Sequence, residues 1–148
     1  MAPLEVVEAA HDTRRVKLDR RRREKHCALP VAMREGSLRR RRASPSGDVG
    51  GIYLDARHRI LSEREIFVGT LSSASVSPRD VFRFALNAHA AAVIVFHNHP
   101  SGDPSPSPQD LAFTAKLVGI GQPLGVEVLD HLIVTSSAFV SFRQRNLL

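Results

Sequence analysis

The stretch AAVIVFHNHPSGDPSPSPQD, residues 91–110, decides the fold. It opens with an unbroken apolar run, Ala91 to Phe96, whose length and composition suit a strand buried on both faces of a sheet. It closes with Ser107 and Pro108, which are typical of the residue that caps a helix and of the first helical position. A buried strand followed by a capped helix is typical of an α/β protein.

The flanking regions supply the other predicted elements. Residues 49–55 and 59–69 alternate as two strands of an antiparallel hairpin. In residues 77–92, Ser77 and Pro78 predict a helix start. Its apolar face is expected to carry Val81, Phe82, Ala85, Leu86 and His89. The helix after Ser107 is expected to end near three breakers, Gly119, Gly121 and Pro123. Residues 126–135 and 138–142 read as strands, so the order β-β-α-β-α-β-β predicts a mixed-sheet α/β sandwich.

The excess positive charge of the chain lies in its first third. The 148 residues carry a formal charge of +6; Met1 to Asp48 hold thirteen Lys/Arg against seven acids, whereas Val49 to Leu148 hold eight of each. Blocks of like charge favour a solvated chain. We therefore expect residues 1–46 to form a disordered or diverged basic segment and residues 47–148 to form the folded domain.

Two arginine runs, residues 20–23 and 39–42, suggest a partner for the basic segment. Such runs bind nucleic-acid phosphates without sequence preference. The segment contains no aromatic residue on which a base could stack. Nonspecific nucleic-acid contact and a solvated tail without a partner both remain open.

The cysteine count and the apolar runs bear on the compartment. The single cysteine, Cys27, excludes an intramolecular disulfide and a zinc site built from several thiolates. No apolar run has the length of a membrane span, and the N-terminus lacks an apolar signal core. We expect a cytoplasmic protein that does not bind a membrane.

Two histidines and an aspartate form a candidate metal site. In an extended chain His97 and His99 point to the same side, whereas Asn98 points away. They follow the buried strand at its carboxyl end, where α/β folds place ligands. Asp110 lies in the first turn of the next helix and can fold back beside them. Two imidazoles and one carboxylate make a three-ligand zinc set with a fourth position open for water.

Each of these residues also has a structural interpretation. Asp110 could complement the helix dipole, and the histidines could make ordinary hydrogen bonds at a strand end. Their placement before and after the loop favours the metal. Structural zinc is normally held by four protein ligands, so three ligands favour a catalytic site in which zinc lowers the pKa of a bound water to about 7.

Residues 97–110, HNHPSGDPSPSPQD, closely resemble the RadC family, with PRDVFRFAL (78–86) before them and DHLIV (130–134) after. Members of that family contain a JAMM-type (MPN-like) metalloprotease domain with the pattern H-x-H, seven residues, Ser, two residues, Asp. All four positions are present here, as His97, His99, Ser107 and Asp110. The resemblance covers about residues 49–148.

The resemblance implies a cytidine-deaminase-like α/β fold and a zinc ion on His97, His99 and Asp110. It also implies hydrolysis of a peptide or isopeptide bond by a zinc-bound water, with Ser107 assisting the water or the oxyanion. The role of Ser107 as helix cap is equally open, and we expect that the two roles use different atoms and can coexist. RadC proteins have been labelled DNA-repair proteins, which implies a link to DNA metabolism.

The sequence departs from the family pattern at the general base. JAMM domains use a glutamate before the first strand, and its position falls near Gly47 here. Asp48 is the nearest candidate, but it is one methylene shorter and one residue out of register, which aims it to the other face. Glu63 and Glu65 are expected on the solvent face of their strand. A zinc-containing binding module without turnover is therefore the alternative function.

Three further residues have two interpretations each. Asp103 could support a ligand histidine or stabilise a turn, and Asp130 and His131 could support the site or the fold. The adjacent letters HNH at 97–99 suggest an HNH nuclease. That motif draws its histidines from separated positions, so the letters alone do not support a nuclease.

Overall fold

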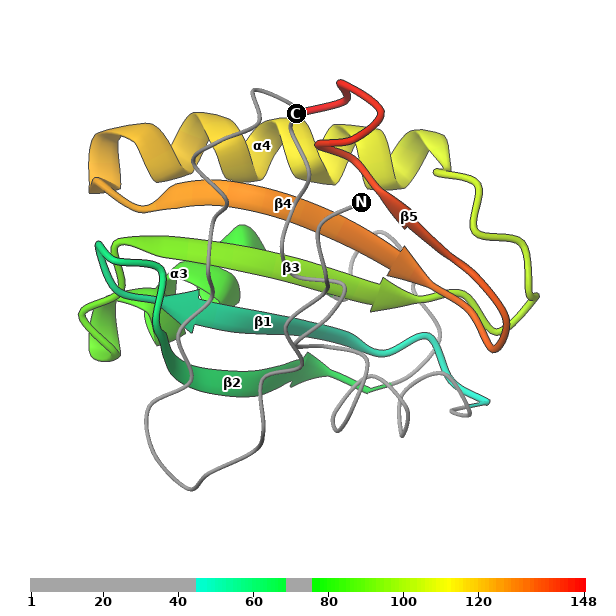
Figure 1. Ribbon diagram of the computed structural model, residues 1–148, viewed down its shortest axis with the longest axis horizontal. Coiled ribbons are helices and arrows are strands. Elements are labelled where there is room, and N and C mark those ends of the chain that lie inside the picture. The colour runs from blue at the N-terminus through cyan, green and yellow to red at the C-terminus, as the bar shows by residue number, and fades with distance from the viewer. Residues whose placement is uncertain (1–44, 69–75) are drawn as a thin grey trace, which may run out of the picture.

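The computed structural model describes residues 45–68 and 76–148 (Figure 1). The elements are β1 (Val49–Leu54), β2 (Ile60–Phe67), α3 (Pro78–Asn87), β3 (Ala92–Asn98), α4 (Pro108–Leu124), β4 (Glu127–Val134) and β5 (Phe139–Ser141). Their order confirms the predicted β-β-α-β-α-β-β succession. The prediction for the basic segment falls almost entirely on residues 1–44, which lie outside the described residues.

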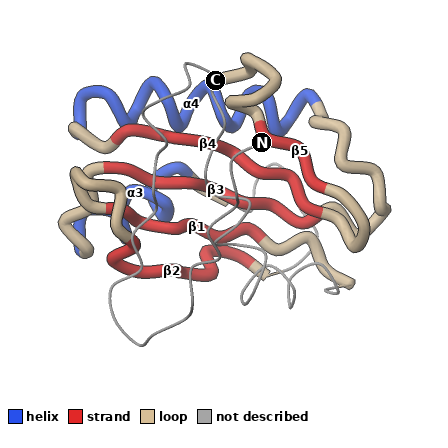
Figure 2. Tube along the Cα trace, in the orientation of Figure 1, coloured by secondary structure: helices blue, strands red, loops and turns tan. Residues whose placement is uncertain are grey.

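The five strands form one mixed sheet in the order β2-β1-β3-β4-β5. β1 runs antiparallel to both β2 and β3, whereas β3 and β4 are parallel and β5 returns antiparallel to β4. α4 connects the two parallel strands. The loop that leads from β3 into α4 lies at the end of the sheet where β3 finishes (Figures 1 and 2). The α/β mixed-sheet prediction is therefore confirmed.

Alternation along β3 divides the core between the two faces of the sheet. Val93 and Val95 pack in a cluster with side chains of α3 and α4. Ile94 and Phe96 belong to a second cluster on the opposite face. All seven residues of β3 are buried, as the apolar run predicted. Because His97 follows Val95 by two positions, its ring faces the side of the sheet that carries the helices.

α3 begins as the sequence indicates but ends earlier. The Ser77 side chain accepts a hydrogen bond from the Arg79 N–H, and Pro78 starts the helix. The helix ends at Asn87, and His89 lies beyond it in a left-handed conformation with φ of 50°. Leu86 is 51% exposed. Val81, Phe82 and Ala85 are buried as expected, whereas the expectation for Leu86 and His89 was wrong.

α4 is longer than predicted and runs through all three supposed breakers to Leu124. Gly121 does not end the helix. It allows the helix to pack closely on the chain at Val126, since a Cβ there would collide with the Val126 carbonyl. The helix ends at Gly125, whose φ of 68° is the left-handed conformation that glycine adopts without strain. β3 is also longer than predicted, because it includes His97 and Asn98.

No helix within residues 45–68 and 76–148 combines the length and the hydrophobicity needed to cross a membrane.

Candidate metal centre

The backbone at the end of β3 stays extended because strands on both sides hold it. The Asn98 N–H donates to the Asp48 carbonyl at 2.9 Å, and the His99 N–H donates to the Val134 carbonyl at 2.9 Å. His97 and His99 therefore leave the chain on the same side, with ring centroids 4.6 Å apart. The Asn98 carboxamide instead donates to the Ser46 carbonyl at 2.8 Å.

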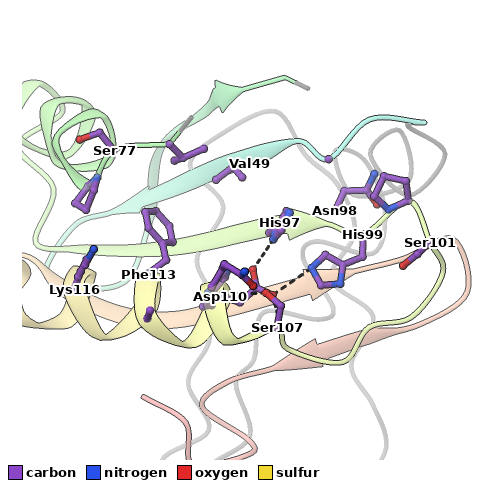
Figure 3. A pocket seen from close by; sticks show the side chains of 17 residues that line it. Val49, Ser77, His97, Asn98, His99, Ser101, Ser107, Asp110, Phe113 and Lys116 are labelled. Carbon is purple, nitrogen blue, oxygen red and sulfur yellow. Dashed lines mark hydrogen bonds and ion pairs between the residues drawn. The ribbon is translucent and has the colours of Figure 1, made fainter. Parts of the chain in front are cut away.

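The Asp110 carboxylate lies against both imidazoles (Figure 3). Asp110 Oδ1 is 3.1 Å from His97 Nδ1, and Asp110 Oδ2 is 3.4 Å from His99 Nε2. One ligand atom from each of the three residues lies within 4.8 Å of the others. The structure thus brings together the three predicted ligands, and their two nitrogens and one oxygen can hold a metal ion.

Ser107 and Asp110 form a capping box that fixes the carboxylate. The Ser107 N–H and hydroxyl both donate to Asp110 Oδ2, at 2.7 and 2.6 Å, and the Asp110 N–H donates to Ser107 Oγ at 3.2 Å. The cap interpretation of Ser107 is therefore present in the structure. Ser107 also lines the cavity. The expectation that its two roles use different atoms was wrong, because the cap bond uses Oγ, the only side-chain oxygen that could also assist a water.

Asp103 supports His99 and also makes a turn. Its backbone carbonyl lies 2.9 Å from His99 Nδ1, and its carboxylate accepts a hydrogen bond from the Ser105 N–H at 2.9 Å. His99 Nδ1 donates to that carbonyl. In the protonated ring Nε2 also donates to Asp110, whereas in the neutral ring Nε2 is unprotonated and can bind a metal ion. Metal-binding histidines are commonly oriented by such a bond.

Electrostatics favour a cation between these residues. Burial would raise the pKa of the Asp110 carboxyl, but hydrogen bonds from His97, His99 and Ser107 outweigh burial and hold it well below its ordinary value. The hydrogen bond to Asp110 raises the pKa of His99 despite partial burial. Asp110 is therefore a carboxylate at any physiological pH, and it attracts positive charge.

His131 stands beside the three candidate ligands without joining them. Its buried ring stacks on Phe142 at 4.6 Å, and its Nδ1 lies 2.6 Å from Thr114 Oγ1. Burial lowers the pKa of His131 to about 3, so the ring is neutral. His131 lines the cavity, whereas the Asp130 carboxylate accepts hydrogen bonds from the Ser141 hydroxyl and the Arg143 N–H.

The three ligands line a cavity of about 950 Å³. Val49 of β1, which pairs with His97, and Gly47 also line it. Phe113 and Lys116 of α4 extend it away from the ligands (Figure 3). Lys116 contributes a primary amine and Phe113 an apolar ring. The sequence reasoning had singled out neither residue, and neither carries a recognisable motif.

Asp48 does not reach the cavity. Its carboxylate is buried and accepts a hydrogen bond from the Ser46 hydroxyl at 2.7 Å, whereas its neighbours Gly47 and Val49 line the wall. Asp110 is the only carboxylate that lines the cavity among residues 45–68 and 76–148. Within that part of the chain, no second carboxylate takes the place of a general base.

Glu63 and Glu65 lie on β2, at the edge of the sheet, and neither lines the cavity. Glu65 is exposed, and Glu63 is half-buried. The structure does not bring them to the ligands. His58, in the turn between β1 and β2, and His89 also lie outside the cavity wall.

A family model for the RadC-like JAB domain matches residues 32–147. The chain belongs to the RadC family. A UPF0758 protein of Shouchella clausii is 45% identical over 94 residues, which are 64% of this chain and 41% of that protein. A UPF0758 protein of Clostridium perfringens strain 13 is 44% identical over 97 residues, which are 66% and 43% of the two chains.

The family match and these relatives confirm the RadC resemblance that the HNHPSGDPSPSPQD motif indicated. The aligned part spans only about two fifths of the curated relatives, 41% and 43% of their lengths. The match begins at residue 32, so it reaches into the segment 1–46 that we expected to lie outside the domain. The domain boundary at residue 47 stays a prediction.

Proposed function

We propose that this RadC-family chain is a zinc-dependent hydrolase of JAMM type that acts on a peptide or isopeptide bond. The observation that carries the proposal is the convergence of His97, His99 and Asp110 within 4.8 Å on the wall of a large cavity. Imidazole and carboxylate ligands suit zinc, and a set of three leaves one coordination position for a water or a substrate.

The residues of the chain would divide the work as follows. His97, His99 and Asp110 would hold the zinc, and the Asp103 carbonyl would keep His99 in the tautomer that leaves Nε2 available. Ser107 would hold the Asp110 carboxylate in place through its N–H and its hydroxyl. Bound zinc would supply a Lewis acid and a water of lowered pKa.

A second candidate function is a zinc-containing binding module without turnover, linked to DNA metabolism. The specific observation that favours it is Gly47, which lines the cavity at the position expected for the family's glutamate and offers no side chain for proton transfer. In this function the basic segment 1–46 would bind nucleic-acid phosphates, and the protein would work in the cytoplasm.

The first test is zinc content together with cleavage of a degenerate library of internally quenched peptides. We expect the full chain to bind one zinc and to cleave part of the library in a chelator-sensitive manner. His97→Ala with His99→Ala should abolish both. His89→Asn is the matched control, since it removes an exposed histidine outside the cavity and asparagine tolerates positive φ.

The outcomes separate the two functions. Zinc bound by the wild type and released by the double variant, without cleavage of any peptide, would favour the binding module. Absence of zinc from the wild type, or retention of zinc by the double variant, would contradict both. DNA binding that weakens with salt and is lost when the arginines at 20–23 and 39–42 become glutamine would support the nucleic-acid link.

A further inference from the structure

Thr114, one turn after Asp110 on α4, makes two short hydrogen bonds with its single hydroxyl. Thr114 Oγ1 lies 2.6 Å from the Asp110 carbonyl oxygen and 2.6 Å from His131 Nδ1. The Thr114 and His131 side chains are both buried, with 0% and 1% of their surface exposed. Both hydrogen bonds are therefore shielded from bulk water.

The two contacts fix the direction of each bond. A hydroxyl carries one hydrogen, and the Asp110 carbonyl can only accept, so the hydroxyl hydrogen goes to that carbonyl. Thr114 Oγ1 must then accept a hydrogen bond from His131, whose Nδ1 carries the hydrogen. His131 is thereby the Nδ1–H tautomer with an unprotonated Nε2, which agrees with its low pKa.

This pair links the helix that carries Asp110 to β4, the strand beside β3 and its two histidines. A threonine that donates to the carbonyl four residues earlier makes a bond within its own helix. The second bond leaves the helix and ties its first turns to β4. On β4, His131 pairs with Val95 of β3, two residues before His97. The path from Asp110 to His97 therefore runs through Thr114, His131 and one strand pair.

His131 is itself held firmly in place. Its ring stacks on Phe142 at 4.6 Å and meets the edge of Phe113 at 6.3 Å. Only a planar ring with an N–H donor satisfies the stacking and the bond to Thr114 together. Phenylalanine at this position would stack without donating, and glutamine would donate without stacking.

We propose that Thr114 and His131 are positioning residues that set Asp110 against His97 and His99 so that the three can share one metal ion. The proposal deepens the proposed metal function and rests on it. Ser107 fixes the Asp110 carboxylate from the side of the loop, and Thr114 fixes the Asp110 backbone from the side of the sheet. Thr114 and His131 need not touch the metal, and their effect passes entirely through Asp110.

The test is the zinc dissociation constant of the full chain, measured by competition with a chromophoric chelator. Thr114→Val should weaken zinc binding about 10- to 100-fold, the usual loss when a supporting hydrogen bond of a ligand is removed. Thr114→Ser keeps the hydroxyl and should bind zinc like the wild type. His131→Phe should weaken binding similarly, and the double variant with Thr114→Val should be no weaker than either alone.

Thr135→Val is the matched control. Thr135 is also buried, and its hydroxyl hydrogen-bonds to Ala138 in the turn between β4 and β5. Its replacement should lower the melting temperature and leave the zinc dissociation constant unchanged. A Thr114→Val chain that behaves in the same way, less stable with unchanged zinc binding, would overturn the positioning role and leave the metal site itself standing.

A second readout does not need the metal. Long-range proton–nitrogen NMR of the zinc-free chain at neutral pH should show His131 with a protonated Nδ1 and an unprotonated Nε2. An unprotonated Nδ1 would overturn the assigned bond directions and the proposal built on them. A wild-type chain that binds no zinc would instead contradict the proposed function, and the role of Thr114 with it.

Discussion

The two walls of the cavity differ in what they bring to a metal ion. The wall made by the end of β3 and the start of α4 presents His97, His99 and Asp110, and hydrogen bonds support each of them. The adjoining wall at the start of β1 presents Gly47 and Val49, which have no polar side chain. In the proposed function, metal binding and proton transfer would depend on different segments, so a chain could keep the first without the second.

The two walls share only part of their construction. The ligand wall depends on the extended end of β3, the capping box and the bond from Thr114 to His131. The capping box and the bond from Thr114 to His131 do not involve the segment around Gly47, whereas the end of β3 is held in part by the Asp48 and Ser46 carbonyls. Side-chain changes that keep these backbone contacts should therefore affect one wall more than the other.

The largest effect should come from Asp110→Asn on the ligand wall. The amide has no negative charge for a metal, so zinc affinity should fall by more than the roughly 10- to 100-fold typical of a supporting residue. Asparagine keeps the size of the side chain, and the fold should persist by circular dichroism. Isothermal titration with zinc gives the measurement, and affinity within a few-fold of the wild type would exclude Asp110 as a ligand.

The next largest effect should come from a change at Gly47, on the wall that has no polar side chain. Gly47→Glu should place a carboxylate on the cavity surface and raise the rate of peptide cleavage by about 10²- to 10⁴-fold, the usual contribution of a general base. Zinc affinity should not change. Gly47→Gln is the control because it has the same size and cannot accept the proton. Equal rates for the two variants, with zinc bound, would show that the missing base does not limit the reaction.

A smaller effect is expected from pH. The pKa of His131 is about 3 in the folded chain and near 6.5 in an unfolded one, so between these values only the unfolded chain binds the proton. The free energy of unfolding should fall as pH drops from 6.5 towards 4.5, by at most about 1.4 kcal/mol per pH unit. Glutamine cannot titrate, so His131→Gln should reduce this slope.

Urea unfolding of the zinc-free chain at pH 6.5 and 4.5 measures this slope. His89→Asn serves as the control, because His89 is an exposed histidine outside the cavity. An equal slope in the wild type and in His131→Gln would mean that His131 is not kept neutral by burial.

The smallest effect should come from the two helix caps. Ser107→Ala and Ser77→Ala each remove a capping oxygen and should each cost about 1 kcal/mol of stability. Only Ser107 donates to a candidate ligand, through Asp110 Oδ2. Zinc affinity should therefore fall in Ser107→Ala and stay constant in Ser77→Ala, and an equal response of the two variants would assign Ser107 to the fold alone.

The sequence predicted those features of the ligand wall that depend on local periodicity. His97 and His99 share a side because side chains alternate along any extended chain, and Ser107 with Pro108 marks a helix start in any context. The end of α4 was missed because Gly121 meets a packing need that only the docked helix reveals. The sequence alone does not distinguish a glycine that ends a helix from a glycine that allows close packing.

Other features require the assembled sheet. The bond between Thr114 and His131 depends on how α4 lies over β4, and a threonine inside a helix gives no sign of it. Asp103 was expected to support a ligand histidine or a turn, but the sequence does not show that its backbone carbonyl is the atom that meets His99. The sequence therefore predicted the candidate ligands but not the hydrogen bonds that orient them.

The most direct measurement of the central claim is X-ray absorption spectroscopy at the zinc edge of the zinc-loaded full chain. We predict a shell of nitrogen and oxygen ligands near 2.0–2.1 Å with two imidazoles, and a spectrum that disappears with the bound zinc in His97→Ala with His99→Ala. A sulfur ligand near 2.3 Å would place the zinc on Cys27. That result, or an unchanged spectrum in the double variant, would contradict the assignment.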